Sequence, residues 1–166
     1  MIIVLDSNEY INCFNNNVLL LNKITLNEIF TIYINETITK EVLNNINEYS
    51  KKGFFNFLFT SHIIAYNQKL PDSLLMKYKQ LGLKKGDIAI AAFCEAIEAD
   101  YLITENRHFL KSLENQRFIE NAVHFRSARK SKDFRHSGHQ KFKEFFSAKK
   151  FNFKVLSLRQ FLNRLK

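Results

Sequence analysis

The chain has 166 residues, of which 46% are hydrophobic, and it carries 25 Lys and Arg against 16 Asp and Glu. This length fits a single domain over residues 1–166, whose core needs no disulfide or structural metal. The 17 Phe and only 4 Gly exclude disordered and collagen-like chains. No apolar run approaches the roughly 18–20 residues that a membrane-spanning helix needs.

The amino terminus and the cysteines indicate the compartment. The opening sequence MIIVLD has no basic leader and no small-residue cleavage site, so we expect no signal peptide. Cys13 and Cys94 stand alone in apolar contexts, which favours buried free thiols over a disulfide. We therefore expect a cytoplasmic protein.

The first half of the chain begins an alternation of apolar strands and helices. Residues 2–5 form a continuous apolar run of the kind found in buried parallel strands, and 31–34 form a second, β-branched run. Thr39 is a candidate N-cap for a helix over about 40–49.

The second half continues this alternation. Its expected elements are a helix from Asp72 or Ser73 to near Gly82, an apolar helix over 88–99, a strand over 101–104, and a strand over 153–157 with a capped helix after it. Apolar strands alternating with helices predict an α/β sandwich with a mainly parallel sheet.

Most of the positive charge lies in one segment. Residues 111–150 contain 11 Lys and Arg and four acids, and so carry +7 of the net +9. This stretch is far longer than the usual ~2–6-residue connection between a helix and a strand, so we interpret it as an insertion. Its basic centre is expected to contact the backbone of a nucleic acid through Arg126, Arg129, Lys130, Lys132 and Arg135. A solvated surface loop is the alternative that charge alone leaves open.

Acidic and amide side chains follow the predicted strands. Asp6 comes directly after 2–5, Glu105 and Asn106 come after 101–104, and Asp87 opens the helix before that strand. Glu41 is expected in the first turn of the helix after 31–34. Ligands of open parallel sheets bind outside the carboxyl ends of the strands, so these groups are expected to converge.

A convergence of carboxylates requires cations, and hard oxygen ligands favour Mg²⁺ or Mn²⁺. The alternative for Glu41 and Asp87 is that each merely complements a helix dipole. Asp6 is harder to explain structurally, because an unpaired charge beside a buried strand costs several kcal/mol.

The remaining acids are expected to lie elsewhere. Glu95 is eight residues beyond Asp87, about 12 Å along a helix, and cannot share its ion. Glu9 and Glu36 are expected to face solvent, and Asp100 to be a turn residue before its strand.

Four stretches, in order, resemble the segments of PIN-domain nucleases and extend over nearly the whole chain. They are IVLDSN at 3–8, TITKEVL at 37–43, GDIAIAAFCEAIEADYLITENRHFL at 86–110 and FKVLSLRQFLNRL at 153–165. The third stretch is the most specific, because it resembles an acid, a helix, a strand and a further site position in one run.

The resemblance implies a three-layer α/β/α fold and a Mg²⁺- or Mn²⁺-dependent nuclease that usually acts on RNA. Many members are toxins of toxin–antitoxin pairs and form dimers, so an antitoxin and a homodimer are possible partners. By position, the resemblance places the catalytic and metal-binding groups at Asp6, Glu41, Asp87 and Asn106. Many members have Asp where this chain has Asn106, and the missing charge should weaken binding of a second ion.

The resemblance also suggests supporting groups around the site. Asn8 and Thr104 match small polar positions, with plain strand-end capping as the alternative. Glu105 is a candidate to replace the missing charge of Asn106, although adjacent residues leaving a strand tend to point apart. Arg107 is a candidate contact to the scissile region, with packing or solvent exposure equally open.

These observations together predict a metal-dependent endoribonuclease without a covalent intermediate. One rival is a phosphatase with Asp6 as nucleophile, but that chemistry needs a second Asp two residues on, where Asn8 stands. The other rival is a catalytically weak or inactive RNA-binding module, which the neutral Asn106 makes possible.

Overall fold

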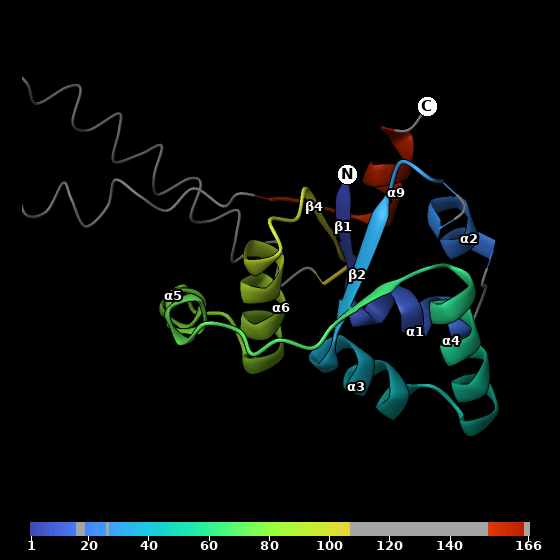
Figure 1. Cartoon of the computed structure of the whole chain (residues 1–166), viewed down its shortest axis with the longest axis horizontal. Coiled ribbons are helices and arrows are strands. Elements are labelled where there is room, and N and C mark those ends of the chain that lie inside the picture. Colours follow the sequence, from blue (N-terminus) through green and yellow to red (C-terminus); the bar gives the residue numbers. More distant parts are fainter. Residues whose placement is uncertain (16–18, 26, 107–152, 165–166) are drawn as a thin grey trace, which may run out of the picture.

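The protein has an α/β fold built on a five-stranded sheet in which every strand pair is parallel (Figure 1). The computed structural model describes residues 1–15, 19–25, 27–106 and 153–164. The sheet order is β3-β2-β1-β4-β5. The strands are β1 (Ile2–Leu5), β2 (Thr31–Asn35), β3 (Ile64–Tyr66), β4 (Tyr101–Ile103) and β5 (Lys154–Leu156).

Helices connect the strands and cover the sheet. They are α1 (Ser7–Asn15), α2 (Leu19–Thr25), α3 (Glu36–Asn45), α4 (Glu48–Thr60), α5 (Asp72–Gln80), α6 (Lys85–Ala96) and α9 (Leu158–Asn163). Figure 1 shows α5 beside α6 at one end of the molecule, with α1, α3 and α4 grouped towards the other. The arrangement is compatible with the expected three-layer sandwich. Within the described ranges, none of the helices has the length and apolar character needed to cross a membrane.

The strand order reverses between β1 and β4, and this reversal positions the site. The chain builds β1, β2 and β3 outwards in one direction, then returns through α5 and α6 to place β4 on the other side of β1. Connections leaving β1 and β4 therefore diverge at the carboxyl edge of the sheet, which opens a crevice there. Asp6 follows β1 and Thr104 follows β4 at this point.

The central strands are buried because their side chains are apolar on both faces. Ile3, Val4 and Leu5 of β1 have no exposed surface, and neither have Leu102 and Ile103 of β4. Burial on both faces is what a continuous apolar run predicts for a parallel sheet. The polar group that ends each of these runs is consequently held at a fixed place on a rigid core.

Several sequence predictions are confirmed by the structure. The strands at 2–5, 31–34, 101–104 and 153–157 all form, with small differences at their ends. The helix that begins at Asp72 is followed by Gly82 with φ of +78°, a left-handed conformation that glycine adopts without strain. Both cysteines are buried free thiols.

The predicted helix over 40–49 was wrong at both ends. α3 begins at Glu36, because the Asn35 side chain accepts a hydrogen bond from the backbone N–H of Ile38 and caps the helix. Thr39 lies inside α3, where its hydroxyl donates to the Asn35 carbonyl. Glu41 is therefore in the second turn and not in the first.

Candidate functional site

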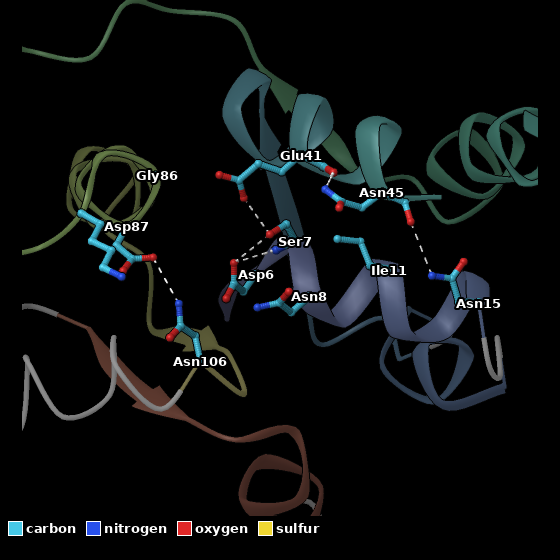
Figure 2. A pocket seen from close by; sticks show the side chains of 11 residues that line it. Asp6, Ser7, Asn8, Ile11, Asn15, Glu41, Asn45, Gly86, Asp87 and Asn106 are labelled. Atoms are coloured by element: carbon cyan, nitrogen blue, oxygen red, sulfur yellow. Dashed lines mark hydrogen bonds between the residues drawn. The ribbon is translucent and has the colours of Figure 1, made fainter. Parts of the chain in front are cut away.

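A pocket of about 570 Å³ lies at the carboxyl edge of the sheet, where the strand order reverses (Figure 2). The residue after β1, the helices α1, α3 and α6, and the segment after β4 surround it. The lining residues are Asp6, Ser7, Asn8, Ile11, Asn15, Glu41, Asn45, Lys84, Gly86, Asp87 and Asn106. The structure thus places Asp6, Glu41, Asp87 and Asn106 in the lining of one pocket, and the catalytic and metal-binding roles expected of them stay predictions.

Asp6 is the most buried of the pocket carboxylates, with 3% of its surface exposed. The hydroxyl of Thr104 donates to its Oδ2 at 2.5 Å, and the backbone N–H of Ser7 donates to its Oδ1 at 2.7 Å. Burial raises the pKa of Asp6 above its ordinary value, and the hydrogen bonds from Thr104 and Ser7 oppose this rise. A cation in the pocket would favour the ionised form of this carboxyl.

Ser7 connects the first two acids, a role that the sequence analysis missed. It is 5% exposed, and its hydroxyl lies 2.7 Å from Oε2 of Glu41 and 3.3 Å from Oδ1 of Asp6. The shorter contact identifies Glu41 as the main acceptor of its single proton. A hydroxyl next to Asp6 at the start of a helix was the available signal, but the sequence did not reveal that α3 lies opposite.

Gly86 allows Glu41 to reach the pocket from α3. A Cβ atom built on Gly86 would stand 2.5 Å from Oε1 of Glu41, closer than real Cβ contacts. The Glu41 carboxylate is therefore confined between the Ser7 hydroxyl and the first turn of α6. Any side chain at position 86 would displace it.

Asp87 and Asn106 form the opposite wall. The amide of Asn106 donates to Oδ1 of Asp87 at 3.3 Å, and its backbone N–H donates to the Thr104 hydroxyl at 3.0 Å. Thr104 has no exposed surface and supports Asp6 and Asn106 together. Figure 2 shows Asp87 and Asn106 to the left of Asp6, while Glu41 lies above Asp6 and extends its carboxylate towards Gly86.

The other supporting residues predicted from sequence fall in different places. Asn8 lines the pocket from α1. Glu105 is not among the described lining residues, and its Oε1 instead accepts a hydrogen bond from the backbone N–H of Leu158 at the start of α9. Glu105 therefore points away from Asn106, as expected for neighbours leaving a strand.

Glu9 was expected to face solvent, and this prediction was wrong. Its side chain is in the interior, with 2% of the residue exposed, and its Oε1 has no hydrogen-bond partner within the described part of the chain. Burial, and then the charges of Glu105 and Asp6, raise the pKa of Glu9 to about 7. α1 begins at Ser7, directly after β1, and Glu9 is one of the residues on its buried face.

The acids that were expected from the sequence to lie away from the site are outside the pocket lining, except that Glu9 is buried. Glu36 is exposed and pairs with Lys40. Asp100 is exposed and accepts the backbone N–H of Ile2 before β4 begins. Glu95 binds Lys77 on the α5–α6 side.

The donor set of the pocket suits a hard cation. Three carboxylates and an amide supply oxygen, while no His or Cys is among the described lining residues. Across the described ranges, no three Asp, Glu, His or Cys side chains gather closely enough to hold a metal by themselves. Mg²⁺ commonly keeps several waters and takes one or two carboxylates plus a substrate phosphate, so an open acidic pocket fits it better than a closed cage would.

The basic residues predicted to contact nucleic acid lie outside the described residues. They are Arg107, Arg126, Arg129, Lys130, Lys132 and Arg135, and the whole 111–150 insertion falls with them. Lys84 is the cation among the described lining residues, and it stands at the N-cap of α6.

Comparison with known proteins leaves the family open. No family model, no curated protein and no solved structure matches this chain. The resemblance to PIN-domain nucleases therefore rests on the four sequence stretches and stays a prediction.

Proposed function

We propose that the protein is a Mg²⁺- or Mn²⁺-dependent phosphodiesterase of the PIN-like type, and that its substrate is RNA. The observation that carries the proposal is the meeting of Asp6, Glu41, Asp87 and Asn106 in one pocket. These groups come from four separate segments at the edge of the sheet where ligands of open α/β sheets bind. The helix dipole gives Asp87 a structural reason for its place in the first turn of α6. It gives none for Glu41 in the second turn of α3, or for the buried Asp6.

Asp6, Glu41 and Asp87 would hold the ion together with waters and a substrate phosphate, because in the described ranges the carboxylates alone do not gather closely enough for a closed metal site. The amide oxygen of Asn106 would assist. When bound, the ion supplies a water of lowered pKa and offsets charge on the phosphate. The chain's own part is to keep these ligands in place. Thr104 and Ser7 fix both oxygens of Asp6, since each donates a hydrogen bond to a different one.

Lys84 supplies positive charge in an otherwise acidic lining. Phosphates are repelled by carboxylates, so a cation at the rim is needed to draw the RNA backbone towards them. Lys84 lines the pocket together with Asp87, three residues later on α6. The basic 111–150 segment would add a longer-range attraction of the same sign. An antitoxin and a homodimer, which the resemblance implies, belong to this proposal as possible partners.

The proposal is tested with a fluorescent single-stranded RNA incubated with Mn²⁺, with EDTA, and with the Asp6→Asn variant. We expect cleavage by the wild type in Mn²⁺ and none in EDTA or by the variant. Asp72→Asn is the matched control, because Asp72 is an exposed acid on α5, outside the pocket. Cleavage that persists in EDTA or in Asp6→Asn would remove the metal mechanism.

A non-catalytic RNA-binding module is the second candidate. It is favoured by the neutral Asn106, whose amide already donates to Asp87. Tight RNA binding by the wild type without cleavage in either Mg²⁺ or Mn²⁺ would select this candidate over the nuclease.

A further inference from the structure

The pocket lining continues beyond its acidic groups into an open arm along the line where α1 and α3 pack together, and the two asparagines of this arm are exposed. This α1–α3 arm is formed by Ile11 and Asn15 of α1 and by Asn45 of α3. Ile11 and Asn15 are four residues apart and so share a helix face, and Asn45 lies one turn beyond Glu41 in the same way. Figure 2 shows Asn15 and Asn45 across from Asp87 and Asn106, with Asp6 and Ser7 between the two ends.

The size of the pocket leaves room for more than an ion. Six waters around Mg²⁺ occupy roughly 180 Å³, at about 30 Å³ for each water. The pocket measures about 570 Å³. A substrate group can therefore enter it together with a hydrated ion.

The arm differs chemically from the acidic end. The arm offers one aliphatic side chain and two neutral amides, whereas the charged lining residues are Asp6, Glu41, Asp87 and Lys84. Asn45 donates its Nδ2 hydrogen to the Glu41 carbonyl at 2.7 Å, and Asn15 donates to the Asn45 carbonyl at 3.5 Å. Within the described part of the chain, no hydrogen bond to the Oδ1 of either asparagine is seen.

We propose that the α1–α3 arm is a nucleobase subsite, which holds one unpaired base of the RNA next to the cleaved phosphate. This inference rests on the proposed function. Ile11 packs on the face of the base, and the amides of Asn15 and Asn45 bond to its edge, as Asn does when it reads bases. A base inside a duplex cannot enter such a pocket, so the substrate is single-stranded at this position.

The subsite is tested by fluorescence anisotropy in EDTA with labelled ten-nucleotide homopolymers of A, C, G and U. A ribose–phosphate strand of the same length without bases serves as reference. We expect the wild type to bind at least one homopolymer about tenfold more tightly than the strand without bases. Asn15→Ala and Asn45→Ala should reduce this ratio severalfold and leave the affinity for the strand without bases unchanged.

Asn12→Ala and Asn44→Ala are the matched controls. Both residues are exposed asparagines on the same two helices, and neither lines the pocket. In these two variants, the ratio of the affinity for a homopolymer to the affinity for the strand without bases should equal that of the wild type. Asn15→Ala is the decisive variant, because its one described hydrogen bond is long and its loss does not threaten the fold.

Two results overturn the inference, and they have different consequences. Equal affinities for strands with and without bases, or an unchanged ratio in Asn15→Ala, remove the subsite even if the protein cleaves RNA in Mn²⁺. Absence of both RNA binding and cleavage removes the proposed function together with the subsite.

Discussion

Asp6 lies in a buried environment that disfavours its ionised form. A buried carboxylate costs several kcal/mol unless donors compensate it, and here Thr104 and Ser7 each donate one hydrogen bond. These two donors offset burial only partly, since the pKa of Asp6 stays above its ordinary value. A bound cation is the natural remaining source of compensation, which is why Asp6 is central to the proposed site.

Glu9 should make stability depend on pH. Its pKa is about 7 in the folded protein, against 4.5 when unfolded, so between these values the native state binds more protons. The free energy of unfolding therefore contains a contribution from the protonated Glu9, which is fully present below pH 4.5. This contribution, about 3 kcal/mol, is lost as the pH rises to about 7. Glu9→Gln cannot ionise, so it should be more stable than the wild type at pH 8 but not at pH 4.5.

Urea unfolding in EDTA at several pH values measures this difference. Glu28→Gln, a change at an exposed acid, should leave the pH profile unchanged. If Glu9→Gln and the wild type keep a constant difference from pH 4.5 to 8, the buried carboxyl does not titrate in this range.

Gly86→Ala should weaken ion binding through Glu41. An alanine normally stabilises a helix relative to glycine by up to about 1 kcal/mol. At position 86, however, its Cβ would collide with Oε1 of Glu41 and push the carboxylate out of place. We expect calorimetric Mn²⁺ titration to give a dissociation constant about tenfold higher, a loss of about 1.4 kcal/mol.

Gly53→Ala is the control for this change. A Cβ at Gly53 in α4 meets Phe14 at an ordinary 3.7 Å, so this variant should bind Mn²⁺ like the wild type. Equal Mn²⁺ affinities of the two alanine variants would show that Gly86 has no steric role. Recovery of affinity in Gly86→Ala combined with Glu41→Asp would support it, because the shorter acid avoids the collision.

At the scale of the elements, α5 is joined to α6 by a largely buried ionic cluster. Lys77 lies within 2.7 Å of both oxygens of Glu95, and the Tyr78 hydroxyl donates to the same carboxylate. The side chains of Lys77 and Glu95 are 17% and 16% exposed. Removing one partner leaves a buried charge, so Lys77→Met should lower the free energy of unfolding by about 1–3 kcal/mol.

An exposed ion pair provides the comparison. Lys40 and Glu36 on α3 are 68% and 75% exposed, and solvent screens their attraction. Lys40→Met should therefore change the free energy of unfolding by less than about 0.5 kcal/mol. Urea unfolding of both variants measures this contrast, and similar losses would mean that burial does not set the strength of the Lys77 pair.

Sequence patterns predicted the elements that have a strong local signal. β1 and β4 are continuous apolar runs buried on both faces, and Ser157 with Gln160 forms the capping box expected before α9. β3 was missed because it is three residues long, lies at the edge of the sheet and is largely exposed. The start of α3 was misplaced because Thr39 was interpreted as the cap, whereas Asn35, another residue type that caps helices well, caps it in the structure.

The candidate site was predictable to the extent that it follows from topology. Asp6 and Asn106 meet because parallel strands present their carboxyl ends at one edge. The position of Ser7 between Asp6 and Glu41 depends on how α1 and α3 pack. A local sequence pattern does not predict this packing. The same holds for Gly86, whose importance arises from a side chain 45 positions away in sequence.

At the scale of the whole molecule, positive charge is concentrated in one segment of the sequence. Residues 126–143 contain seven Lys and Arg and one acid. Deleting this segment should weaken RNA binding and flatten its dependence on salt, because fewer counterions are released. Binding isotherms at several salt concentrations measure the slope, and an unchanged slope would assign the segment to another role, such as a partner interface.

The claim on which the account depends is that carboxylates from distant parts of the chain bind one divalent ion. Electron paramagnetic resonance of Mn²⁺ titrated with the protein tests it most directly, because the signal of the free ion falls on binding. The wild type should bind Mn²⁺ stoichiometrically at the pocket, and Asp6→Asn and Asp87→Asn should each lose this binding while Asp72→Asn keeps it. Equal Mn²⁺ binding by all four proteins, or none by the wild type, would contradict the account.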